Sequence, residues 1–125
     1  MANVLTMNPV TGLALGRIAI GFAALASPDL ASKLFRLDGA NNPQLPYMTR
    51  MFGSREIALG VTTLVAKGPA RRKLVALGIF VDGADAFAGY EAMRSGSVDN
   101  SVGIGLTAPA VFAVVAGAIG LASKG

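Results

Sequence analysis

Residues 102–122, VGIGLTAPAVFAVVAGAIGLA, form a run of 21 residues without a charged side chain. Because a helix rises about 1.5 Å per residue, this run matches the thickness of the hydrocarbon core of a bilayer. Its glycines and its proline are tolerated in membrane helices, where neighbouring groups satisfy the freed backbone atoms. The run therefore predicts a membrane-spanning helix and a helical membrane fold for the chain around it.

Three further apolar runs precede this one and predict three more spans: residues 10–26, 46–66 and 71–94. Short polar loops between the runs make successive helices antiparallel neighbours. Ala24-Leu25-Ala26 resembles a signal-peptidase site, but no basic segment precedes the first run and Arg17 interrupts it. We therefore expect an uncleaved first span.

The segment between the first two spans, residues 29–37, has a different pattern. Leu30, Leu34 and Leu37 fall on one helical face, and the basic residues of the segment fall away from it. A short helix with this division is typical of the membrane interface. We predict an all-α fold, an integral membrane four-helix bundle with antiparallel helices and a short interfacial helix between spans 1 and 2. A single transmembrane domain covers residues 1–125 in this prediction.

The composition agrees with a membrane location and excludes several kinds of chemistry. Of 125 residues, 53% are hydrophobic and 14% are charged, against about 25% charged residues in soluble domains. The mean hydropathy is +0.57. The chain has no Cys and no His, which excludes disulfides, Cys/His zinc sites, His-ligated haem and a Ser-His-Asp mechanism. We expect no cofactor and no metal site.

The net charge of +4 does not indicate nucleic-acid binding, because the basic residues are not interleaved with aromatic ones. The strongest basic cluster surrounds the short loop between the second and third runs: Lys67, Arg71, Arg72 and Lys73. Basic loops of membrane proteins face the cytoplasm. With four spans, both termini are then cytoplasmic, and Lys124 agrees with this orientation. The lipid bilayer is the expected partner, with a homo-oligomer or a membrane protein partner as further alternatives.

Apart from the charges at the two ends of the third run, six charged residues fall inside the predicted spans, three of each sign: Arg17, Arg50, Arg55, Glu56, Asp82 and Asp85. Each would cost from about 2.5 to more than about 10 kcal/mol at the centre of a bilayer, depending on the scale. They must therefore face one another or a wet cavity. Arg50 is expected nearer the outer surface than the other five.

Helical spacing supports the same conclusion. Gly78, Asp82, Asp85 and Gly89 are separated by four, three and four residues, so they share one face of the third predicted span. The small residues of this face let another helix approach the two carboxylates closely. The uncharged fourth run then forms either a wall of the charged site or a surface offered to lipid or a partner.

Three hypotheses follow for the charged layer. It binds or transforms a lipophilic small molecule, it belongs to a structural accessory subunit of a larger membrane complex, or it serves a small proton-coupled transporter. Carboxylates one helical turn apart suit general acid/base chemistry, and the candidates are Glu56, Asp82 and Asp85. The binding and charge-partner candidates are Arg17, Arg50 and Arg55. The sequence leaves open whether the ion pairs only hold the bundle together and whether the protein is an enzyme.

The segments RMFGSREIALG (residues 50–60) and DGAD (residues 82–85) resemble an uncharacterised family of small four-helix membrane proteins. The wider architecture is similar to that of DoxX-like and anthrone-oxygenase-like membrane proteins. The resemblance covers roughly residues 10–122. It implies a four-helix membrane bundle, and it implies no established reaction and no catalytic residue.

Overall fold

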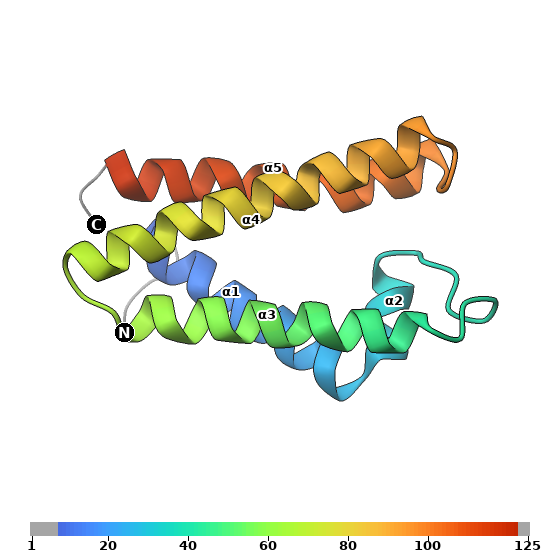
Figure 1. The fold of residues 1–125 in the computed structure, drawn as a ribbon, viewed down its shortest axis with the longest axis horizontal. Coiled ribbons are helices and arrows are strands. Elements are labelled where there is room, and N and C mark those ends of the chain that lie inside the picture. Colours follow the sequence, from blue (N-terminus) through green and yellow to red (C-terminus); the bar gives the residue numbers. More distant parts are fainter. Residues whose placement is uncertain (1–7, 123–125) are drawn as a thin grey trace.

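The computed structural model describes residues 8–122, and helices are the only regular secondary structure within them (Figure 1). The all-α prediction is therefore confirmed for this range. The five helices are α1 (Pro9–Ala26), α2 (Pro28–Leu34), α3 (Leu45–Val65), α4 (Pro69–Arg94) and α5 (Asn100–Ala122). The four long helices match the predicted runs to within two residues at either end. Two of them, α1 and α5, are long and apolar enough to cross a membrane. Lys124 lies outside the described residues.

Proline and short polar side chains set the helix boundaries. Pro9, Pro28 and Pro69 begin α1, α2 and α4, where the missing N–H has no helical partner to lose. The Asn8 side chain caps α1 by accepting a hydrogen bond of 2.7 Å from the N–H of Val10. These residues therefore fix where the three helices begin.

Helix α2 is shorter than predicted and ends at Leu34, not at Leu37. Arg36 adopts a left-handed conformation with φ of 60°. The N–H of Leu37 then bonds to the carbonyl of Ser32, and the N–H of Arg36 bonds to that of Lys33. This pattern is typical of a helix C-terminus. Leu37 therefore lies outside α2, and the prediction that it shares a helical face with Leu30 and Leu34 is wrong.

The loop from α2 to α3 is ordered by its own side chains. Asp38 accepts hydrogen bonds from the side chain of Asn41 at 2.8 Å and from the N–H of Asn41 at 3.1 Å. The bond from the Asn41 side chain is the main reason that the pKa of Asp38 lies below its ordinary value. This fixed loop returns the chain from α2 to the start of α3.

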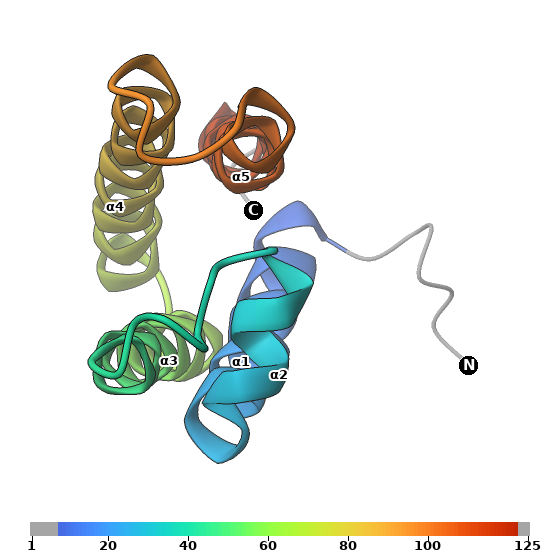
Figure 2. The ribbon, with the colours of Figure 1, turned by 90° about the vertical axis from the view of Figure 1, so that its right-hand side faces the viewer.

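The long helices form two closely packed pairs, α1 with α3 and α4 with α5, and contacts between the pairs are much sparser. Successive long helices run in opposite directions in Figure 1. The end view in Figure 2 places α4 and α5 above α3 and α1, with α2 beside α1. The molecule is thus built from two hairpin-like halves that meet less tightly than each half packs within itself.

Glycines bring the backbones of α1 and α3 together. A Cβ placed on Gly53 would lie 2.6 Å from the carbonyl oxygen of Gly21, and a Cβ on Gly21 would lie 2.6 Å from that of Gly53. A Cβ on Gly60 would also lie 2.6 Å from the carbonyl oxygen of Ala14. Because backbone atoms cannot move aside as a flexible side chain can, these positions require the absence of a side chain.

We predict that Gly53→Ala lowers the free energy of unfolding by about 1–3 kcal/mol, because the added methyl group overpacks the α1–α3 contact. Thermal unfolding followed by far-ultraviolet circular dichroism measures the change. Gly83→Ala is the matched control, since Gly83 also lies in a helix but has no atom within 4 Å of the added carbon. Equal behaviour of the two variants would contradict the proposed close contact.

Candidate functional site

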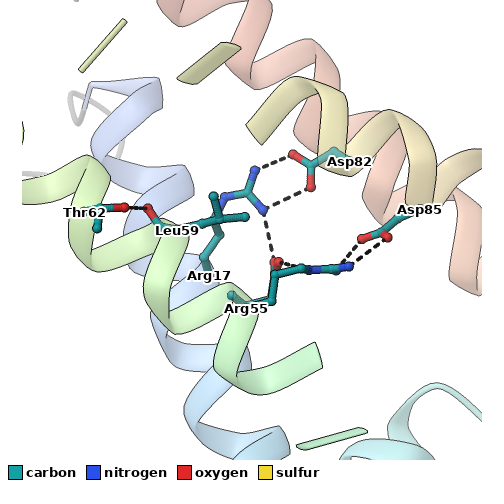
Figure 3. Close-up of polar contacts among 7 residues, drawn as sticks. Arg17, Arg55, Leu59, Thr62, Asp82 and Asp85 are labelled. Atoms are coloured by element: carbon teal, nitrogen blue, oxygen red, sulfur yellow. Dashed lines mark hydrogen bonds and ion pairs between the residues drawn. The ribbon is translucent and has the colours of Figure 1, made fainter. Parts of the chain in front are cut away.

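Arg17 occupies the centre of the charged layer and joins three helices (Figure 3). It projects from α1, and only 6% of its side chain is exposed. Its Nη1 donates to Oε1 of Glu56 on α3 at 3.1 Å and to Oδ1 of Asp82 on α4 at 3.0 Å. Its Nη2 donates to Oδ2 of Asp82. A planar guanidinium suits such paired contacts with carboxylates.

Arg55 continues the layer from the neighbouring position on α3. Its Nε donates to Oε2 of Glu56 at 3.4 Å. Its Nη1 and Nη2 donate to the two oxygens of Asp85 at 3.3 and 2.7 Å. The guanidinium also lies over the ring of Phe52, with its central carbon 5.1 Å from the ring centroid. Arg55 is therefore held by two carboxylates and one aromatic face.

The two arginines and three acids form one network, which runs in the order Asp82, Arg17, Glu56, Arg55 and Asp85. Its members alternate in sign and lie near the middle of α1, α3 and α4 (Figure 3). With all five groups ionised, the network carries one excess negative charge. The structure thus brings together five of the six charged residues singled out in the sequence.

Arg50, the third expected cation, does not join the network. It is exposed, and its Nε donates to the backbone carbonyl of Leu25 at 3.4 Å. The central layer therefore contains two cations and three anions, and not the three of each sign expected from the sequence. Arg50 instead ties the start of α3 to the end of α1.

Small residues provide the room that Arg17 needs. A Cβ placed on Gly78 would lie 2.9 Å from Nη2 of Arg17, and a Cβ on Gly60 would lie 3.3 Å from the Cβ of Arg17. The predicted small-residue face of α4 thus serves two purposes. Its aspartates bind the guanidinium groups, and Gly78 leaves space for one of them.

A cavity of about 900 Å³ lies beside this layer and is lined by residues of all five helices. Its charged lining consists of the five network residues, and its other lining is mostly apolar. The uncharged helix α5 contributes Leu106, Pro109, Ala110 and Ala113, so it forms a wall of the site. Phe35, which follows α2, also lines the cavity. No sequence pattern predicts this contribution, because it depends on how the loop after α2 folds back.

The carboxylates differ in how accessible they are. Glu56 and Asp82 are buried, whereas the side chain of Asp85 is 33% exposed. Both oxygens of each carboxylate already accept a hydrogen bond from a guanidinium, and Glu56 accepts from two different arginines. Within residues 8–122, no group of three acidic side chains is placed to hold a metal ion. The arrangement is thus suited to electrostatic recognition, with Asp85 the most reachable acid.

Comparison with known proteins finds no matching family, curated protein or solved structure. The site is defined by its own geometry: a network of ion pairs among five residues, set in the wall of a largely apolar cavity.

We predict that Arg17→Met destabilises the protein by about 3–5 kcal/mol, because it leaves Glu56 and Asp82 buried without their counter-charge. Thermal unfolding measures the loss. Arg50→Met is the control and should stay within about 0.5 kcal/mol, since Arg50 is exposed and outside the network. Adding Glu56→Gln and Asp82→Asn to Arg17→Met should recover part of the loss. A fully stable Arg17→Met variant would show that the network does not hold the helices.

Proposed function

We propose that the chain is a multi-pass protein of the cell membrane, with α1, α3, α4 and α5 as its spans, that binds a lipophilic small molecule in its central cavity. The observation that carries the proposal is the cavity of about 900 Å³ with the charged network in its wall. Ligand sites are commonly apolar cavities of about 300–1,000 Å³ with a few well-placed polar groups.

The outward surface supports the membrane location. In the most apolar segments of α1 and α5, only 28% and 17% of the residues are buried inside the chain. A core helix of a soluble protein would have most of its apolar surface covered. Large exposed side chains such as Phe22, Phe80 and Phe87 project from the helices, and lipid would cover them.

Helices α3 and α4 carry charges, but their central charges are turned toward the other helices. Arg55, Glu56, Asp82 and Asp85 all belong to the network. Charged residues of membrane helices face the bundle interior and pair with one another. This inward placement supports α3 and α4 as spans despite their lower hydropathy. The resemblance to DoxX-like architecture is part of the same proposal.

We predict that the loop between α3 and α4 faces the cytoplasm and that the loop between α4 and α5 faces outward. The physical reason is the basic cluster around residues 67–73. Because the natural chain has no cysteine, Ala70→Cys and Ser97→Cys provide single labelling sites. In intact cells, a membrane-impermeant maleimide should label the variant at position 97 only. Labelling at both positions in unbroken cells would rule out the proposed topology.

Binding is better supported than acid/base catalysis, because every carboxylate of the layer is already engaged by a guanidinium. The closed ion pairs also suit the alternative of a structural subunit in a larger membrane complex. A structural subunit would leave the cavity without a function, so a variant that fills the cavity separates the two proposals.

We predict that Gly16→Phe abolishes binding of a neutral lipophilic fluorophore, N-phenyl-1-naphthylamine, to the purified protein in a nonionic detergent. Gly16 lines the cavity and has no atom within 4 Å of an added Cβ, so the new ring fills the space without displacing a helix. The dissociation constant, from a fluorescence titration corrected for protein-free micelles, should rise at least about tenfold.

Gly83→Phe provides the matched control, since Gly83 also has room for a Cβ but does not line the cavity. It should bind the fluorophore as the natural chain does. If the natural chain does not bind, or if both variants lose binding equally, the cavity is not the ligand site.

A further inference from the structure

We infer that the molecule bound in the cavity is a lipophilic cation, an apolar body carrying one positively charged amine or ammonium group that lies beside Asp85. The inference rests on the proposed binding function and deepens it by naming the ligand class. It follows from which charges line the cavity and which of them remain open to a ligand.

The charge of the cavity wall is negative overall. Among the residues that line it, two are cationic, Arg17 and Arg55, and three are anionic, Glu56, Asp82 and Asp85. With all five ionised, one negative charge has no counterpart within the wall. Arg50 does not supply it, because its side chain is exposed and bonded to the carbonyl of Leu25. An uncompensated charge beside a largely apolar wall favours a ligand of opposite sign.

Neither cation offers a favourable place for an anionic group. Arg17 is buried, with Glu56 and Asp82 on its donors and Gly78 packed against Nη2. Arg55 is partly exposed and gives three of its N–H groups to Glu56 and Asp85. An anionic ligand on its remaining N–H groups would lie beside these carboxylates, which would repel it.

A cation meets no such obstacle at Asp85. This carboxylate is the most exposed acid of the network and lines the cavity. Each of its oxygens has a second lone pair that can accept from an ammonium group. Phe35 also lines the cavity, and aromatic faces attract cations. The apolar wall from α5 would cover the body of such a ligand.

Three probes that differ only in head group test the inference: pyrenebutyl-trimethylammonium, pyrenebutanol and pyrenebutanesulfonate. Each is titrated into the purified full chain in a nonionic detergent, with titrations of protein-free micelles subtracted. We expect the ammonium probe to bind at least about tenfold more tightly than the alcohol, and the sulfonate to bind most weakly. This order is measured on the natural chain, so it does not depend on whether a variant folds.

Asp85→Asn should remove most of the preference and bring the ammonium probe close to the affinity of the alcohol. Glu91→Gln is the matched control, because it also removes one negative charge from α4. Glu91 pairs with Arg94 and lies outside the cavity. This substitution should leave the preference unchanged. If the alcohol or the sulfonate binds as tightly as the ammonium probe, the cation inference is overturned while the binding function stands. If none of the three binds, the binding function itself is overturned.

Discussion

The arrangement of the helices depends on the guanidinium of Arg17, which bonds to α3 and α4 from its position on α1. The two helix pairs touch each other sparsely, so this side chain supplies much of the link between them at mid-height. Two other polar contacts cross between the pairs nearer the helix ends, from Arg71 to Thr11 and from Arg36 to Ser101. Arg55 also crosses at mid-height, to Asp85, so among the described residues four arginines connect the two halves at three heights.

A buried ion pair is weak evidence for stability, because removing two charges from water costs several kcal/mol per ion. Well-packed apolar side chains would often serve as well or better at the same position. The chain nevertheless places five charged groups in its centre and leaves a cavity beside them. A network meant only for cohesion would gain from having that space filled. The combination of costly buried charges and unfilled space therefore supports the proposed recognition of a ligand.

Much of this site could be read from the sequence because helical spacing is a strong constraint. The four-three-four spacing from Gly78 to Gly89 placed Asp82 and Asp85 on one face, and the structure has both in the network. Spacing could also have separated Arg50 from the others, since at about 100° per residue it lies about 140° from Arg55 around α3. The count of charged residues in the predicted spans includes Arg50, because a count takes no account of the helix face on which each residue lies. The charge pattern predicts that these residues face one another or a cavity, but the shape and size of the cavity could not be predicted, because they depend on the distance between the two helix pairs.

The distance between the pairs follows from the side chains that bridge them. Within a pair, glycine against glycine lets α1 and α3 approach until backbone meets backbone. Between the pairs, the bridges are the long side chains of Arg17 and Arg55, each extended to a carboxylate on α4. A bridge of that length holds α4 away from α1 and α3, and small residues such as Gly12 and Gly16 on α1 do not fill the gap. Near the helix ends Gly120 of α5 packs against Val10 of α1, but at mid-height arginines bridge the two halves. The cavity and the charged layer therefore have one cause at mid-height: the length of these arginine side chains.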